Sequence, residues 1–504
     1  IDNWMMQEEL PMLYNQYKIT IPHVFVYNIE LRGKDYIQVK QRDSSIHATE
    51  REGSGAGGVS KDFTVSAQET TFISRNLPAI RQDESYCWCP EDYKVQVSFD
   101  LQGTQFTPNE YKPYSQKWED VDKQLLKPEN TQFGEHLSLT NPFRPETKQA
   151  YNSEMNFEEK IICAFQVLKK KMAWNGRYQL YSKELEKVIK KGSGSNADLN
   201  FILISILKDF GLEAYPVVMS RRSSGMLPYN FPSLQKLNTF FVAIHDINKQ
   251  KYVFLDSSMD VPAFNILPLE LSVNKARILS RKEKEENKWV NVMTLSNNKS
   301  FMKIDARIEG DQVKGHRSTV LYGQEAIEYQ ANENHKQDNL VSNPENKVSQ
   351  KEKLTVTNLK VKKQENDWAL IEEEFDFVLQ ADRTDDHLYI NPMLFPQLKS
   401  NPFIQTERVL PIEFPYPYKF TMLSTLTLPE GYEVEELPQS QSIRSEGDGL
   451  QCKYMIQQQG NTILLNYVFH LKGYIFLSEQ YKQLQELWAK VIEKNNALIV
   501  LKKI

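Results

Sequence analysis

The sequence predicts an α+β protein of several domains: an N-terminal β-sandwich over residues 1–140, a central α+β core over 141–285, and a β-rich C-terminal domain with a terminal helix over 286–504. One observation is the length, because 504 residues exceed what a single hydrophobic core usually serves. The second is alternation of polar and apolar residues, typical of half-buried strands, at both ends of the chain. The third is a change to helical periodicity in the middle, and segregated strands and helices indicate an α+β architecture.

In the first part, three stretches alternate as strands do, namely "YKITIPHVFVYNIEL", "KDFTVSAQETTFI" and "YKVQVSFDLQG". We therefore expect strands throughout residues 1–140. Ahead of the second stretch, Gly53, Gly55 and Gly58 match the GxGxxG pattern. A phosphate-binding version follows a buried strand and opens a helix, whereas charged residues precede this one and an alternating stretch follows it. The pattern predicts a mobile loop here.

The central part changes to a helical period. "NFEEKIICAFQVLKKKMAW" is amphipathic, and "SKELEKVIKK" and "GSGSNADLNFILISILKDFG" follow as further helical stretches. Three strand patterns come next: "EAYPVVMS", "TFFVAIHD" and "KYVFLDSS". We expect helices followed by an antiparallel sheet.

Beyond about residue 290, strand patterns return in "FMKIDARIEG" and "STVLYG", and a polar stretch over 332–352 indicates a long loop or hairpin tip. A helix is predicted after the candidate cap Ser478, and "ALIVL" is predicted to form a final strand. The apolar face of this helix comprises Leu484, Leu487, Trp488, Val491 and Ile492.

The composition limits the classes of partner. The 61 basic and 66 acidic residues are spread along the chain and give a net charge of −5, so we expect no nucleic-acid partner. No apolar run approaches the roughly 20 residues that a spanning helix needs, so no transmembrane segment is predicted.

The four cysteines indicate neither a disulfide framework nor a zinc site. Cys87 and Cys89 flank Trp88, while Cys163 and Cys452 are isolated in the sequence. Cys163 lies among apolar residues at helical spacing, which predicts a small buried side chain. We expect no metal and no cofactor.

The stretch that begins at Gly192 has the features of a helix that carries a nucleophile. Ser195 and Asp198 fit a capping box, so the helix is predicted to begin at Asn196 and to end before Gly211. The positive end of the helix dipole would stabilise a thiolate in the first turn. The residue found there is Asn196, whose amide is not a useful nucleophile.

This region resembles a known family. A helix with GxCxD at its start, then LLxxxG(I/L) and a strand, then a strand opening with Asn-His and one ending in Leu-Asp, is similar to the bacterial transglutaminase-like core, a papain-like fold. The likeness runs through "GSNADLNFILISILKDFGLEAYPVVMSRR", "KLNTFFVAI" and "YVFLDSS". The flanks, with "ISRNLPAI", "KSNPFIQTERVLPIEF" and "LPEGYEVEELP", resemble the β-rich domains of unknown function on both sides of this core in one bacterial family.

The resemblance implies where the catalytic residues would lie. The nucleophile position falls on Asn196, the general-base position on Thr239 and the orienting acid on Asp256, so two of the three are replaced. Trp174 resembles the aromatic residue near the family's active site, and packing is the competing explanation. Trp174 and Ser195 are the residues that could line a remaining cleft.

The spacing of the last two strands offers a test of these positions. A turn in "DINKQ" would place Thr239 opposite residue 256 or 257, close enough for a base and its orienting acid. His245 cannot replace the lost base, because it lies about 20 Å further along the strand, near the turn. Ser193 and Ser195 lack an adjacent base that would activate a hydroxyl.

The leading hypothesis is a transglutaminase/cysteine-protease-like protein that has lost catalysis and binds or scaffolds a peptide, protein or glycan. The alternative is an active thiol hydrolase, either a protease or a transglutaminase, that uses an unrecognised site, for which Cys163 is the thiol within the core. Because the family is exported in Gram-negative bacteria, the resemblance implies a periplasmic or cell-surface location.

Overall fold

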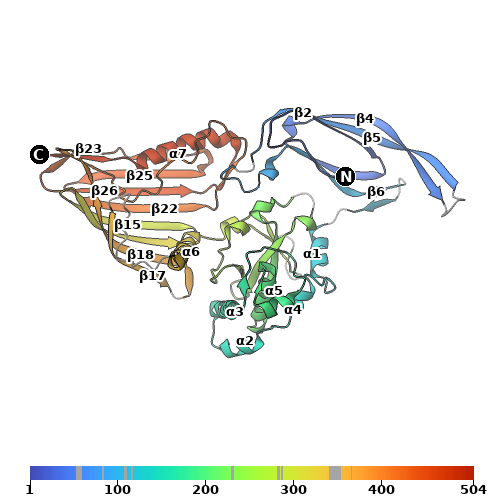
Figure 1. Cartoon of the computed structure of the whole chain (residues 1–504), viewed down its shortest axis with the longest axis horizontal. Helices are drawn as coiled ribbons and strands as arrows, with labels where there is room; N and C mark the ends of the chain where they lie inside the picture. The colour runs from blue at the N-terminus through green and yellow to red at the C-terminus, as the bar shows by residue number, and fades with distance from the viewer. Residues whose placement is uncertain are drawn as a thin grey trace. The chain divides into compact units, whose positions relative to one another are not determined.

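The computed structural model describes residues 1–52, 59–81, 84–106, 110–114, 117–228, 232–280, 284, 288–339, 354–364 and 366–504. The chain divides into two compact units, one made of 1–125 with 222–236, the other of 126–221 with 237–504 (Figure 1). Both strands and helices are present, in several separate sheets, so the protein is a mixed α+β, multi-sheet protein. The predicted loop with Gly53, Gly55 and Gly58 lies outside the described residues.

The first unit contains two antiparallel sheets with a common core. Its strands are β1 (Trp4–Met5), β2 (Met12–Pro22), β3 (Phe25–Arg32), β4 (Gln38–Glu52), β5 (Val59–Leu77), β6 (Gln96–Gln105) and β7 (Tyr111–Pro113). In the described part, β1, β6, β3 and β7 form one sheet, and β2, β5 and β4 form the other. Phe72 of β5 and Phe99 of β6 meet with their ring centroids 6.1 Å apart. Side chains of both sheets therefore share one hydrophobic core.

The prediction of strands throughout residues 1–140 is wrong for the last part of this range. Trp118–Leu126 forms helix α1, and Glu135–Ser138 forms a 3-10 helix. Trp118, Val121 and Leu125 are all buried, at intervals of three and four residues. This helical period, and not alternation, is the signal that the segment carries.

Helices form the first layer of the central region, as the sequence predicts. They are α2 (Arg144–Ala150), α3 (Phe157–Lys171), α4 (Leu185–Lys191) and α5 (Asn196–Asp209). Asn156 and Glu159 form a capping box at the start of α3. Helix α5 is buried over most of its surface because it contacts α3 and the sheet behind it. Its almost continuous run of apolar residues follows from this position.

An antiparallel sheet backs these helices. Its strands are β10 (Glu213–Met219), β11 (Thr239–Asp246), β12 (Lys251–Leu255), β13 (Ala276–Ile278) and β14 (Trp289–Val290). Among the described residues their order is β12-β11-β10-β13-β14. The predicted turn in "DINKQ" is confirmed, because Asp246 pairs with Lys251 across it. A short parallel pair, β8 (Ala173–Trp174) and β9 (Ser193–Gly194), leads into α5.

The C-terminal region is dominated by a large sheet. Its strands are β15 (Lys299–Glu309), β16 (Gln312–Tyr322), β17 (Leu354–Gln364), β18 (Asp367–Gln380), β22 (Tyr418–Thr427), β24 (Gln441–Arg444), β25 (Leu450–Gln459) and β26 (Thr462–Leu471). The order of these described strands is β17-β18-β16-β15-β22-β26-β25-β24, with a parallel pairing between β15 and β22 (Figure 1). Alternate residues of β15 are buried, so the sheet has one covered face.

The covered face is packed against the terminal helix. Helix α7 (Tyr481–Asn495) places Trp488 against Phe469 of β26, with ring centroids 5.6 Å apart. The predicted terminal helix and final strand are confirmed, the latter as β28 (Ile499–Lys503). The predicted cap is wrong, because Ser478 lies in a 3-10 turn and the N-cap of α7 is Gln480. The remaining strands are β19 (Asp382–Arg383), β20 (His387–Ile390), β21 (Ile412–Glu413), β23 (Tyr432–Glu436) and β27 (Ile475–Phe476).

The polar stretch predicted to be a loop begins in a helix instead. Helix α6 (Gln324–Asn339) includes its first residues, and 340–353 lie outside the described part. Residues 332–339 continue a helix that begins in "QEAIEYQA", where glutamine, glutamate and alanine favour helix. In the part of the chain that the structure describes, no helix has the length and apolar character needed to cross a membrane.

Candidate functional site

The site is built around the first turn of α5. Ser195 is the N-cap, and the predicted capping box is confirmed: the Asp198 amide donates to Ser195 Oγ at 3.3 Å, and the Ser195 amide donates to Asp198 Oδ2 at 2.8 Å. The Ser195 hydroxyl also donates to Asp198 Oδ2 at 2.8 Å. Ser195 is 1% exposed, so this hydroxyl belongs to the cap and is not presented to solvent.

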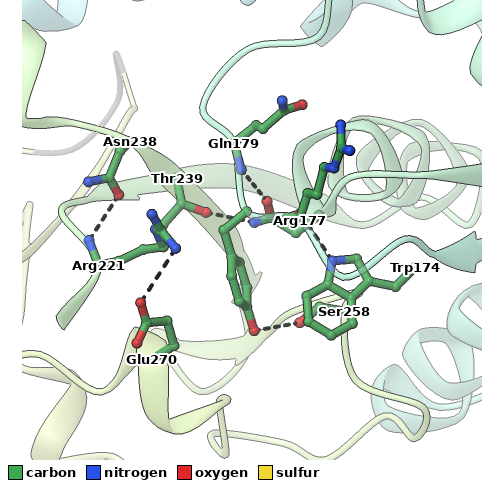
Figure 2. Close-up of polar contacts among 10 residues, drawn as sticks. Trp174, Arg177, Gln179, Arg221, Asn238, Thr239, Ser258 and Glu270 are labelled. Carbon is green, nitrogen blue, oxygen red and sulfur yellow. Dashed lines mark hydrogen bonds and ion pairs between the residues drawn. The ribbon is translucent and has the colours of Figure 1, made fainter. Parts of the chain in front are cut away.

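Asn196 and Thr239, the positions that the resemblance assigns to nucleophile and base, are in direct contact. The Asn196 Nδ2 group donates to Thr239 Oγ1 at 2.7 Å (Figure 2). It also donates to the Phe240 carbonyl at 2.9 Å. The Gln179 amide donates to Asn196 Oδ1 at 2.9 Å. Both side chains are 0% exposed. Each polar atom of the Asn196 amide has a partner, so this pair is a closed internal contact.

Asn200 belongs to this buried polar network, and the sequence analysis missed it. One turn after Asn196, its Nδ2 group donates to the Phe240 carbonyl and to Asp256 Oδ1, each at 2.8 Å. Its Oδ1 accepts from the Ser257 amide at 3.0 Å and from the Ser257 hydroxyl at 2.5 Å. Asn200 therefore joins α5 to β11 and to the residues that follow β12. A polar residue four positions after Asn196 in an apolar helix was the available signal.

Asp256 binds Asn200 and Ser258 rather than residue 239. Its Oδ2 accepts from the Ser258 amide at 3.0 Å and also from the Ser258 hydroxyl. Pairing of β11 with β12 ends at Val242 and Leu255. Continuing that register would set Thr239 opposite residue 258, so the predicted partner at 256 or 257 is wrong by one or two positions. The β11–β12 pairing ends just before Asp256, whose side chain hydrogen-bonds to Asn200 and Ser258 instead.

Burial dominates the electrostatics of this acid. Loss of hydration raises the pKa of Asp256, while hydrogen bonds from Asn200, Ser258 and Asn196 act in the opposite direction. Lys169 of α3 donates to the Ser257 carbonyl at 3.2 Å. Burial lowers the pKa of Lys169, and the charges of Asp260 and Asp256 oppose that shift. A cation thus lies beside the buried acid.

We expect Asp256→Asn to remove a pH-dependent component of stability. A carboxyl with a raised pKa binds its proton more tightly in the folded state, so its contribution is present at low pH and falls as the pH rises from 3.8 through the raised value. The measurement is the unfolding free energy from pH 3.5 upward in wild type and variant, with the nearby Asp260→Asn as control because the Asp260 side chain is 94% exposed. Equal slopes for wild type and Asp256→Asn would contradict the assignment.

Trp174 packs beside the polar network. Its Nε1 donates to the Arg177 carbonyl at 3.1 Å, and its ring centroid lies 5.1 Å from that of Tyr178. The Tyr178 hydroxyl is 3.3 Å from Ser258 Oγ (Figure 2). Trp174 is half-buried and connects to the network through Tyr178.

An ion pair lies on the other side of Tyr178. The Arg221 guanidinium is 5.9 Å from the Tyr178 ring centroid, and its Nη1 is 3.5 Å from Glu270 Oε1. The Arg221 amide donates to Asn238 Oδ1 at 2.9 Å, which joins the residues next to the ends of β10 and β11 (Figure 2). Tyr178 therefore lies between an aromatic ring, that of Trp174, and a charged side chain, that of Arg221 (Figure 2).

The other candidate groups lie away from Asn196. His245 pairs with Tyr252 next to the turn, and its Nδ1 is 3.6 Å from Glu213 Oε2. Cys163 donates to the Ala150 carbonyl at 3.6 Å, and burial raises the pKa of its thiol. Within the described ranges, no group of three His, Cys, Asp or Glu residues is arranged to hold a metal ion.

A solved structure has a fold similar to that of this chain. Over 100% of this chain and 75% of the other, the structure is similar to a "putative protease" from Parabacteroides distasonis, with a TM-score of 0.53 and 13% identity. A "putative cysteine protease" from Cytophaga hutchinsonii matches over 50% of this chain and 80% of its own, with a TM-score of 0.18 and 12% identity. Residues 386–501 match a domain of unknown function with a solved structure, DUF3858. No curated protein matches.

Proposed function

We propose that residues 141–285 are a transglutaminase-like, papain-like core that has lost its catalytic pair, and that the protein is a non-catalytic binding or scaffold module. The observation that carries this proposal is the 2.7 Å hydrogen bond from Asn196 to Thr239 at the start of α5. The resemblance assigns a thiol and an imidazole to these two positions. A buried amide and a buried hydroxyl occupy them.

The chemistry of the pair supports the loss of catalysis. Acyl transfer on such a fold requires a thiolate, an imidazole that accepts its proton, and an acid that orients the imidazole. The Asn196 amide has no useful lone pair for attack, and the Thr239 hydroxyl is not a base near neutral pH. Asp256 accepts from Asn200 and Ser258, so it already has other partners.

The surroundings of the pair support a binding role. Trp174 and Tyr178 offer aromatic surface, and Arg221 with Glu270 offers a fixed pair of charges. These side chains suit a peptide or a glycan, both of which combine apolar surface with hydrogen-bonding groups. The location proposed for this role is the periplasm or cell surface, on the family resemblance.

Turnover assays test the proposal. Wild-type protein is incubated with primary amine donors and glutamine-containing peptides, and separately with a general protease substrate. We expect no turnover above the buffer control. Turnover that is lost in Asn196→Ala, with the variant still folded by thermal unfolding and Ser205→Ala unaffected, would refute the non-catalytic role.

The alternative, an active thiol hydrolase, is favoured by the likeness to a protein described as a protease. It requires a cysteine that is ionised near neutral pH. Iodoacetamide labelling at pH 7 followed by peptide mass spectrometry discriminates the two functions. The raised pKa of Cys163 predicts slow labelling that accelerates at alkaline pH. Rapid labelling of a single cysteine at pH 7, with loss of turnover, would support the hydrolase.

A further inference from the structure

The C-terminal part of the second unit contains a cavity of about 690 Å³. It lies on the covered face of the large sheet, between β15, β16, β18 and β22 and the segment from Leu394 to Lys399. This volume lies in the range of sites that enclose small molecules. It is lined by residues 302–496 and is therefore separate from the network around Asn196.

Arg317 is a largely buried cation in the wall of this cavity. It lies on β16 directly opposite Phe375 of β18. Its guanidinium carbon is 4.3 Å from the centroid of the Phe375 ring and 4.9 Å from that of Phe395. The two rings meet edge to face, with their centroids 5.9 Å apart, and the guanidinium contacts both, so cation–π attraction and packing restrict its orientation. Arg317 is thus a fixed cation before any ligand arrives.

An acid on the neighbouring strand β18 offsets the cost of burying this cation. Glu373, on the same face of β18, forms an ion pair with Arg317, and the Tyr329 hydroxyl donates to Glu373 Oε2 at 2.7 Å. A paired charge can remain ionised where an isolated one could not. Arg317 Nε is buried and has no hydrogen-bond partner among the residues described. The guanidinium therefore has more donors than its internal partner uses.

The rest of the lining combines donors with apolar surface. Lys399 adds a second cation, and Gln380, Gln397 and Asn496 add amides. The lining also has methionine, leucine, proline and phenylalanine side chains, together with the acid Asp382. We propose that this cavity binds a small amphipathic carboxylate, with the carboxylate near Arg317 and Lys399 and the apolar body against the phenylalanine and leucine side chains. A guanidinium binds a carboxylate through charge-assisted hydrogen bonds, which are stronger than those between neutral groups.

The test is isothermal titration calorimetry of the full chain with two probes that differ only in charge. N-acetyl-L-leucine carries the carboxylate and an apolar body, and N-acetyl-L-leucinamide is its neutral counterpart. We expect the acid to bind at least about tenfold more tightly than the amide. Equal affinities, or no heat from either probe at millimolar concentration, would overturn the proposal. Binding of chitobiose without binding of the acid would replace it with a glycan site.

Matched variants locate the site. Arg317→Gln/Glu373→Gln removes both charges together, so that no buried carboxylate is left alone. We expect it to lose about tenfold in affinity for the acid and to leave the amide unaffected. Lys399 lies at the exposed edge of the cavity, so Lys399→Gln is the variant to use if the double variant unfolds. We expect it to lower the affinity for the acid about threefold. Lys303→Gln is the control, since Lys303 neighbours buried Ile304 on β15 and so points to the opposite face. Unchanged acid binding in the first two variants would overturn the proposal.

Discussion

Asn200→Ala is expected to lower the unfolding free energy of the central region by about 4 kcal/mol. The substitution leaves Asp256 Oδ1 and the Ser257 amide, both buried, without the partners that lie at 2.8 and 3.0 Å. Each unsatisfied buried group costs about 1–3 kcal/mol. The truncation also opens space between α5 and β11, which adds a packing cost.

Hydrogen exchange of peptides from α5 is the suitable measurement, because a chain with two compact units need not unfold in one step. The matched control is Ser205→Ala on the same helix. Ser205 is buried, but its hydroxyl donates only to the Ile202 carbonyl within the helix at 2.7 Å. We expect this control to cost about 0.5 kcal/mol. If both variants lower the unfolding free energy equally, the hydrogen bonds of Asn200 to Asp256 and Ser257 do not stabilise the central region.

Gly194→Ala is expected to cost about 3 kcal/mol, although it adds a single methyl group. A Cβ at this position would lie 2.5 Å from Val188 Cγ1 and 2.9 Å from both Asp198 Cβ and Asp198 Oδ2. Asp198 is held by the capping box with Ser195, so it cannot move aside without losing the N-cap of α5. The glycine before this helix is therefore required by close packing.

The comparison for this prediction is Gly176→Ala, measured by the same exchange experiment. Gly176 has a φ of +82° but no atom within 4 Å of the added Cβ. Its cost comes from backbone conformation alone, about 1 kcal/mol. If Gly194→Ala lowers the unfolding free energy no more than Gly176→Ala does, a methyl group fits beside Gly194 and the close packing described here is wrong.

Local features of the fold could be predicted from the sequence. The capping box of α5, the helices α3 and α7, and the hairpin of β11 and β12 depend on neighbouring residues, so periodicity and cap signals suffice. The parallel pairing of β15 with β22 joins segments more than 100 residues apart. No local pattern specifies which of many similar strands pair, and the order of the large sheet could not be predicted.

The site was predictable only in part. The family resemblance predicted that Asn196 and Thr239 lie close together, and in the structure Asn196 Nδ2 is 2.7 Å from Thr239 Oγ1. The role of Asn200 depends on Asp256, which lies 56 residues away in the chain. The register of the β11–β12 hairpin sets Thr239 opposite residue 258, and Asp256 binds Asn200 after the strand has ended. An error of one or two residues in the predicted register was therefore enough to misplace the acid.

The measurement that tests the central claim most directly is a double-mutant cycle on Asn196→Ala and Thr239→Val. The claim is that these two side chains form a buried structural contact where the resemblance places a nucleophile and its base. A direct hydrogen bond predicts a coupling energy of about 1 kcal/mol between the two substitutions, read from hydrogen exchange of α5. Additive effects of the two substitutions would show that the side chains are not in contact, and would contradict the account.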